Sequence, residues 1–365
     1  MRYLVKPFFV GLFSCLWYCS LAQSNRASFL STLSVGAKTH YGFLVVNQPK
    51  SEYVRDSHTY FGELTISTQT TGEKQWQQAN HNPQIGISLL YGNSGSREYV
   101  GHVAALFPYM KFPLFKTAHT LTSFRLGFGA GWVQKPYNKE TNTKNLLIGT
   151  KLNGCINMQF EQEWQLHKNC YFNAGFSFIH ISNGSFTLPN LGLNIPALSL
   201  GLRYAFHPVQ AVIEKQQWPA FVKKWHYSLF TYAAGKQSYP LESPVYLVNT
   251  VMIEAARDIS RTGRLGVGLN GTFDRSLSRE TDSFEFDKSD PQWQASAYGL
   301  YERFVGNLSI PFQVGFYLFN KYQITSFYQV IGLRYRFLPH WVAGLQLKAH
   351  LGKADYLQWG LGYKF

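Results

Sequence analysis

The chain has 365 residues, of which 17% are aromatic and only 15% charged, with 31 glycines and a formal net charge of +14. Few charges combined with many aromatics and glycines exclude an intrinsically disordered chain, which needs the reverse composition. The length is sufficient for one large barrel or sandwich, or for two smaller domains.

Residues 1–22 have the pattern of a secretory signal. Arg2 and Lys6 make its start basic, an apolar run covers 8–16, and small residues allow cleavage after Ala22. The alternative is an uncleaved membrane anchor. The apolar run is too short for this, since a spanning helix needs roughly 18 apolar residues. We therefore expect an exported protein that loses this segment.

Several segments of the mature chain alternate with a period of two, which is typical of strands whose side chains point to opposite faces. One face is large and aromatic and the other is small or polar, whereas a soluble sandwich usually has a charged, wet face. No mature segment approaches the roughly 18 apolar residues of a spanning helix. The pattern therefore favours the inside-out wall of an outer-membrane barrel. The clearest segments are 124–132, 198–206, 327–337 and 357–365.

The strand-like segments fall into two groups, with about eight before His207 and roughly six to eight after it. The region 208–225 interrupts the alternation with two prolines and a lysine pair, and we expect it to connect 23–207 to 226–365. The chain ends on Phe365, which resembles the C-terminal signal that outer-membrane proteins present to their insertion machinery. We predict an all-β, transmembrane antiparallel outer-membrane β-barrel of about 14–16 strands, with two eight-stranded barrels as the alternative.

Few other residues suggest a metal or a cofactor, and we expect neither. Cys155 and Cys170 are not placed opposite each other if the chain turns near His167, which predicts no disulfide. Two thiols at this spacing do not form a metal site. A group of acidic residues is better explained as a solvated extracellular loop than as a cation site. These residues are Asp282, Glu285, Asp287 and Asp290.

A polar trio lies where two predicted strands meet a loop. His180 and Ser182 continue the apolar face of the segment 172–178, and Asn194 begins the apolar face of the next strand. The intervening residues 183–193 are rich in turn formers. Because the two strands are antiparallel, we expect the three side chains at one rim of the barrel, pointing outward.

These residue types fit nucleophilic catalysis. A serine needs a base within hydrogen-bond reach, and His180 can take the proton of Ser182. Asn194 can accept from the other imidazole nitrogen and hold the ring in the required tautomer. The Asn183 side chain or the Gly184 N–H can donate to the oxyanion of an attacked ester. A His-x-Ser pair also arises by chance, and residues at a membrane interface often only meet headgroups. The shared face, the asparagine and the constrained loop favour catalysis.

The segment His180-Ile-Ser-Asn-Gly184, followed by Pro189-Asn-Leu-Gly192, resembles the signature of outer-membrane lipid A 3-O-deacylases, the acyloxyacyl hydrolase-like family. The resemblance covers mainly the first half of the mature chain. It implies a small eight-stranded barrel with its active site on the outer wall. The implied reaction is hydrolysis of the ester that holds the acyl chain at position 3 of lipid A. The resemblance also implies that Ser182 is the nucleophile and His180 the base.

The third member of the trio departs from the family pattern. The best-known deacylases carry glutamate where this chain has Asn194. The outer-membrane phospholipase A family also places His-x-Ser-Asn-Gly on a barrel wall and completes its triad with asparagine. Those enzymes depend on calcium and dimerise, and no acidic calcium site stands out near the trio here. The Pro-Asn-x-Gly loop favours the deacylase.

The sequence therefore predicts an outer-membrane serine esterase that removes an ester-linked acyl chain from lipid A. A phospholipase A-like enzyme and a non-catalytic barrel or pore are the alternatives. The basic excess suits phosphorylated lipid A or lipopolysaccharide, while nucleic acid is an improbable partner for an exported barrel. Four arginines either hold lipid phosphates or line a lumen. They are Arg125, Arg203, Arg334 and Arg336.

Overall fold

The computed structural model describes residues 32–46, 49–207, 218–239, 241–277, 292–321, 325–351 and 353–365. The expected signal segment 1–22, most of the expected connector and the acidic loop residues 282–290 lie outside the described residues. The described chain consists mainly of strands, with one short 3-10 helix, η1 (Pro49–Val54), and one short α-helix, α3 (Gln75–Ala79).

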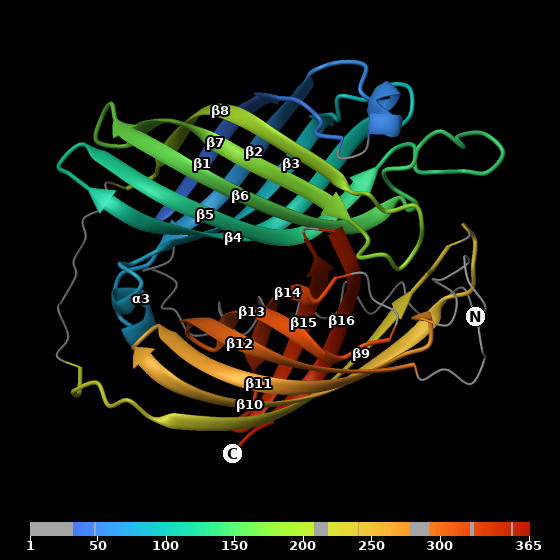
Figure 1. The fold of residues 1–365 in the computed structure, drawn as a ribbon. Coiled ribbons are helices and arrows are strands. Elements are labelled where there is room, and N and C mark those ends of the chain that lie inside the picture. Colours follow the sequence, from blue (N-terminus) through green and yellow to red (C-terminus); the bar gives the residue numbers. More distant parts are fainter. Residues whose placement is uncertain are drawn as a thin grey trace.

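The first eight strands form a closed antiparallel barrel in which each strand pairs with the next (Figure 1). The barrel closes because the last of these strands pairs back on the first, with Leu198 opposite Tyr41. The strands are β1 (Leu33–Gly42), β2 (Thr59–Gln69), β3 (Gln84–Asn93), β4 (His102–Lys116), β5 (Thr120–Val133), β6 (Leu152–Gln165), β7 (Cys170–Ser182) and β8 (Leu193–Ala205).

The last eight strands form a second closed barrel beside the first (Figure 1). It closes where β16 pairs with β9, with Gln358 opposite Ala234. The strands are β9 (Trp225–Lys236), β10 (Tyr246–Ser260), β11 (Gly263–Asp274), β12 (Trp293–Val305), β13 (Leu308–Phe319), β14 (Phe327–Arg336), β15 (Trp341–His350) and β16 (Lys353–Lys364).

The predicted fold class is confirmed, and the chain takes the form that the sequence left as the alternative. It is all-β and antiparallel, and its strands form two eight-stranded barrels in place of the single larger barrel that we preferred. The physical reason is edge pairing. The free edge of β8 is taken by β1 and not by β9, so the sheet is already closed before the chain enters 208–224.

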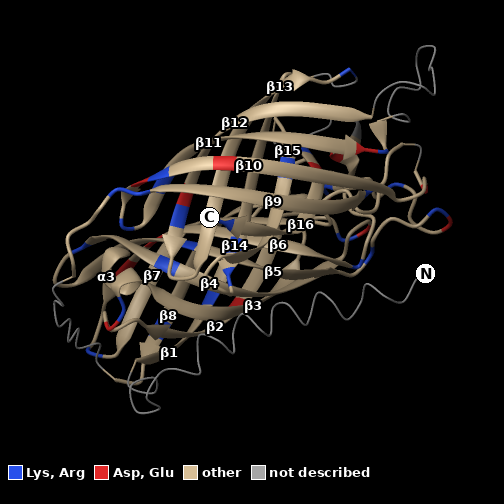
Figure 2. Cartoon of the chain, turned by 90° about the horizontal axis from the view of Figure 1, so that it is seen from below, with Lys and Arg blue, Asp and Glu red and all other residues tan. Residues whose placement is uncertain are grey.

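The barrels have apolar outer walls and interiors in which many polar and charged side chains are buried beside smaller clusters of apolar ones. On β8, Leu198 is 66% exposed and Leu200 55%, whereas Ser199 between them is 2% exposed. Most of the length of the strands carries no charged residue (Figure 2). An exposed apolar wall around a polar interior is the arrangement of barrels whose outer face contacts lipid. The protein is accordingly a bacterial outer-membrane barrel protein.

In the described part of the chain, no helix is long and apolar enough to cross a membrane.

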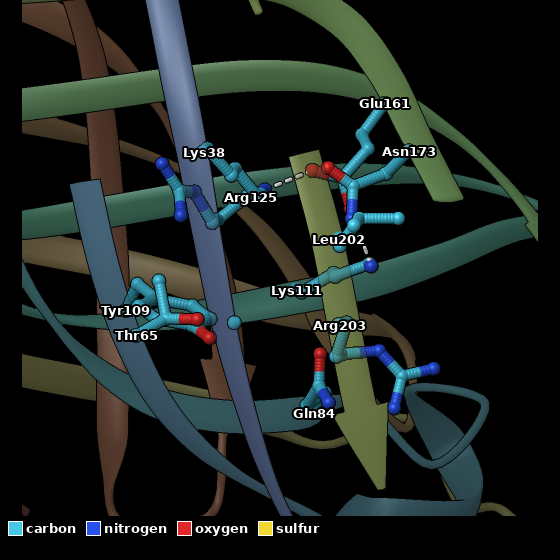
Figure 3. Close-up of a pocket in the computed structure, with 11 residues that line it drawn as sticks. Lys38, Thr65, Gln84, Tyr109, Lys111, Arg125, Glu161, Asn173, Leu202 and Arg203 are labelled. Carbon is cyan, nitrogen blue, oxygen red and sulfur yellow. Dashed lines mark hydrogen bonds and ion pairs between the residues drawn. The ribbon is translucent and has the colours of Figure 1, made fainter. Parts of the chain in front are cut away.

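Part of the interior of the first barrel is occupied by paired charges (Figure 3), beside a cluster of buried apolar side chains. Lys38 on β1 and Lys111 on β4 both bind Glu161 on β6, the latter with 2.5 Å between Nζ and Oε1. Arg203 donates from Nη2 to Glu163 Oε1 at 2.6 Å. The cavity among these residues has a volume of about 10 Å³, which is room for one water at most.

The arginines singled out in the sequence mostly line the two interiors. Arg125 donates from Nη2 to Glu63 Oε2 at 3.0 Å, and Arg334 donates to both carboxylate oxygens of Glu254 at 2.8 and 2.6 Å. Arg336 lies at a strand end, where it donates to Asn307 Oδ1 at 3.0 Å. The lumen-lining interpretation therefore holds for Arg125, Arg203 and Arg334.

The two ends of the first barrel differ in the length of their connections. At one end the connections are 70–83, 117–119 and 166–169. At the other end they are 43–58, 94–101, 134–151 and 183–192, which are longer on average. Outer-membrane barrels have short periplasmic turns and longer extracellular loops. The junction of β7 and β8 therefore lies at the extracellular end.

Candidate active site

The polar trio occupies the junction of β7 and β8. In the antiparallel register, His180 lies directly opposite Asn194. Ser182 ends β7 two residues after His180, so both side chains leave the strand on the same face. That face is the outer one, because Phe176 on it is 48% exposed while Ile179 and Ile181 on the opposite face are completely buried.

The imidazole of His180 bridges the other two side chains. Its Nδ1 lies 2.7 Å from Asn194 Oδ1 and its Nε2 lies 2.9 Å from Ser182 Oγ. The Asn194 oxygen can only accept, so Nδ1 carries the proton and Nε2 is left to accept from the serine hydroxyl. This is the tautomer that a general base requires.

Two glycines shape the surroundings of these side chains. Gly154 on β6 lies opposite Ser182, and a Cβ added there would meet only the Ser182 carbonyl, at 3.4 Å. The outer wall is therefore open beside the serine, which is itself only 9% exposed. Gly192 has a φ of +76°, and a Cβ there would lie 2.9 Å from His180 Cε1. Its missing side chain allows the loop to pack against the imidazole.

The Asn183 side chain forms hydrogen bonds that hold the β7–β8 loop in place. Its Nδ2 donates to Thr150 Oγ1 at 3.1 Å and to the Thr187 carbonyl at 2.9 Å. Both amide hydrogens are therefore engaged. Gly184, with φ at +63°, is the other residue that the sequence suggested as an oxyanion donor. Its N–H makes no hydrogen bond with the described residues.

Asn190 is a further polar residue of the site that the sequence analysis did not single out. Its Oδ1 accepts from the Asn183 backbone N–H at 3.0 Å, which holds it beside the residue that follows Ser182. Its Nδ2 is buried and has no hydrogen-bond partner among the described residues. A buried donor without an acceptor is rare in native structures and often marks a functional position. Its place in the Pro189-Asn-Leu-Gly192 segment was the signal that could have identified it.

Each of the two barrels matches its own protein-family model. The family model described as lipid A 3-O-deacylase (PagL) matches residues 61–203, and the model described as acyloxyacyl hydrolase, C-terminal domain, matches residues 225–365. Together they span most of the chain. The chain belongs to the lipid A 3-O-deacylase family. The resemblance seen in the first half of the sequence is thereby confirmed, and it extends to the second half, to which the sequence analysis assigned no function.

Solved structures similar to this lipid A deacylase family member are outer-membrane barrels. The outer membrane enzyme PagL is 19% identical, with a TM-score of 0.31, over 47% of this chain and 98% of that one. Neisserial surface protein A is 10% identical, with a TM-score of 0.32, over 48% and 97%. The KdgM porin is 8% identical, with a TM-score of 0.19, over 91% and 99%. No curated protein matched the chain.

Among the described residues, no group of three or more His, Cys, Asp or Glu side chains is placed to hold a metal ion. Cys155 and Cys170 are both free thiols.

Proposed function

We propose that this family member hydrolyses an ester that links an acyl chain to lipid A. Ser182 is the nucleophile, His180 the general base and Asn194 the residue that orients the imidazole. The observation that carries the proposal is the bridging imidazole, 2.9 Å from the serine oxygen and 2.7 Å from the asparagine oxygen, on the outer wall of the first barrel. The family model over residues 61–203 supports the substrate class.

The reaction follows from the positions of these atoms. Ser182 Oγ attacks the acyl carbonyl carbon while its proton passes to His180 Nε2. The tetrahedral intermediate collapses, and His180 returns the proton to the departing sugar hydroxyl. Water then attacks the acyl-enzyme by the same route in reverse, which releases the fatty acid and restores the serine.

The developing oxyanion requires hydrogen-bond donors near Ser182. Gly184 N–H and Asn190 Nδ2 are two donors of the loop that have no acceptor among the described residues. The Asn183 side chain, which the sequence suggested, is less suited because Thr150 and Thr187 use both of its amide hydrogens.

The position of the site matches the position of lipid A in the membrane. The trio lies at the extracellular end of β7, with the exposed side chain of Phe176 on the same face further into the membrane. An ester at the boundary of the outer leaflet can therefore reach Ser182 while its acyl chains remain beside the apolar wall. This arrangement does not require the substrate to enter the lumen.

A phospholipase A-like activity is the second candidate. The specific observation in its favour is the asparagine that contacts His180, since the resemblance to deacylases implies glutamate there. Assaying the purified protein on both lipid A and phospholipid decides between the two substrates.

The proposal is tested by Ser182→Ala and His180→Ala. Each removes an atom of the proton-transfer pair, so each is expected to lower acyl release from lipid A by more than about 10³-fold. Release is measured by mass spectrometry of lipid A, with heat-modifiable migration of the folded barrel as the control for folding. Unchanged lipid A spectra with and without the wild-type protein would contradict the proposal and favour the non-catalytic barrel.

A further inference from the structure

The seam that closes the second barrel is incomplete at its extracellular end. β9 and β16 pair from Gln358–Ala234 to Lys364–Ser228. β16, however, begins at Lys353, before this paired stretch. The first residues of β16 therefore lie beyond the part of the seam that β9 closes. Backbone groups left without a partner strand at a sheet edge are free to bind another segment of chain.

The loop that follows the catalytic serine occupies this opening. The backbone N–H of Leu357 donates to the Gly184 carbonyl at 3.2 Å, and the N–H of Gln237, just after β9, donates to the Ser185 carbonyl at 3.0 Å. Ser185 Oγ in turn donates to the Ala354 carbonyl at 3.1 Å. Two consecutive loop residues of the first barrel thus bridge both sides of the seam in the second.

Side chains strengthen the same contact. The N–H of Leu188 donates to Gln237 Oε1 at 2.8 Å. The ring of Phe186 packs on Gly235, where an added Cβ would lie 3.3 Å from Phe186 Cε2. A Cβ on Gly184 would lie 2.6 Å from the Cβ of Leu357. Residues 184–188 are therefore held against the second barrel along their length.

We infer that the second barrel positions the catalytic loop of the first. The inference rests on the proposed function, in which Gly184 N–H stabilises the oxyanion. The carbonyl of Gly184 is bound by Leu357, so the second barrel limits how this residue can turn. Reaction rates respond strongly to such placement, since an error of about 1 Å can cost roughly 10²-fold.

Gln237 offers a selective test because it is outside the trio and outside the loop. Gln237→Ala removes the acceptor of the Leu188 N–H, and Gln237→Glu keeps an acceptor there. Both variants lose the bond from Gln237 Nε2 to the Ser243 carbonyl, which measures 2.8 Å. The difference between the two variants therefore isolates the contact with the loop.

Glu242→Gln is the matched control. Lys139 of the first barrel lies 3.3 Å from Glu242 of the second, and this ion pair joins the barrels without touching residues 184–188. Both side chains are more than half exposed, so the pair contributes little to stability. The control distinguishes positioning of the loop from general attachment of the barrels.

Two rates are measured on full-length protein: acyl release from lipid A, and covalent labelling of Ser182 by a long-chain alkyl fluorophosphonate. Gln237→Ala is expected to lower kcat and the labelling rate about tenfold or more with little change in KM, because the loop is displaced while the lipid-facing wall is intact. Gln237→Glu is expected to restore most of the loss, and Glu242→Gln to behave as the wild type. Heat-modifiable migration checks that each variant is folded.

Wild-type rates in Gln237→Ala would overturn the inference, and so would equal losses in Gln237→Ala and Gln237→Glu. A wild-type protein that reacts with the fluorophosphonate but leaves lipid A intact would instead contradict the proposed substrate, and the labelling rates of the variants would still decide the role of the second barrel. A wild-type protein inert in both assays would remove the proposed function and the inference together.

Discussion

At the scale of single residues, the trio is complete but its third member is uncharged. Asn194 fixes the tautomer of His180 by accepting its Nδ1–H, with 2.7 Å between the heavy atoms. A carboxylate at this position would also stabilise the imidazolium that forms when the serine proton is transferred. The asparagine orients the imidazole but carries no charge. Substitutions at this position can therefore test the effect of the orienting contact and the effect of the charge separately.

Asn194→Ala is expected to lower acyl release by about 10²- to 10⁴-fold, because the imidazole loses its orienting partner. Asn194→Asp keeps an acceptor at similar length and adds the charge, so its rate is expected to equal or exceed that of the wild type. Initial rates on lipid A vesicles measure both. An alanine variant as active as the wild type would show that Asn194 does not orient the base.

Asn183 and Asn190 show that residue type alone does not predict which amide is left to donate to an oxyanion. Both are amides near Ser182, and either can donate to an oxyanion. The fold uses Asn183 to tie the loop to Thr150 and Thr187, while Asn190 has a buried Nδ2 with no hydrogen-bond partner among the described residues. Which amide is free depends on the path of the loop, and a pattern of residues does not specify that path.

At the scale of elements, the β7–β8 connection is a packed part of the site. Gly184 and Gly192 both have positive φ, at +63° and +76°. Gly192 additionally lies where any side chain would contact the His180 ring. Gly192, which marks a turn in the sequence, therefore also sets the distance between the loop and the imidazole of His180.

Gly192→Ala is expected to lower activity by about 10²-fold, because its Cβ would displace the imidazole from the serine. The left-handed backbone adds a stability cost of about 1–2 kcal/mol. Acyl release and urea unfolding followed by tryptophan fluorescence measure the two effects. The matched control is Gly271→Ala, where an added Cβ meets nothing within 4 Å. Full activity in the Gly192 variant would contradict the packing argument.

At the scale of the whole molecule, two barrels with the same orientation are joined at both ends. At the periplasmic end, Asn80 after α3 donates to the Phe304 carbonyl at 3.3 Å and accepts from Arg303 at 2.8 Å. At the extracellular end the β7–β8 loop enters the seam of the second barrel. Buried ion pairs lie inside both barrels.

The charge network of the second barrel predicts a large stability effect far from the site. Glu254 binds Arg334 through both oxygens, at 2.8 and 2.6 Å, and both side chains are buried. Glu254→Gln leaves the buried guanidinium poorly compensated and is expected to cost about 3 kcal/mol of unfolding free energy. The expected cost is at the lower end of the usual range because Glu302, 3.6 Å from Arg334, still compensates part of the guanidinium charge.

Urea unfolding in phospholipid vesicles measures this effect. The exposed Glu242→Gln substitution is the control and is expected to change the unfolding free energy by less than about 1 kcal/mol. Equal midpoints and slopes for the Glu254 variant and the wild type would show that the ion pair does not stabilise the second barrel.

The amino-acid pattern alone was enough to predict which face of each strand is apolar and which residues share a rim. Strand alternation is a local property, because successive side chains must point to opposite faces wherever the backbone is extended. His180, Ser182 and the apolar residues of β7 could therefore be placed together from spacing alone. The turn formers after Ser182 similarly predicted a tight connection to Asn194.

Three features became known only from the folded molecule. β8 closes on β1, Asn190 and not Asn183 has an amide donor without a partner among the described residues, and the second barrel contacts the loop after Ser182. Each of these depends on which strand edges meet and which backbone groups remain unpaired at those edges. Residues such as Gly184 and Leu357 are far apart in the chain, and no local pattern relates them. The two residues are in contact because backbone groups of β16 that β9 leaves unpaired form hydrogen bonds with the loop that lies beside them.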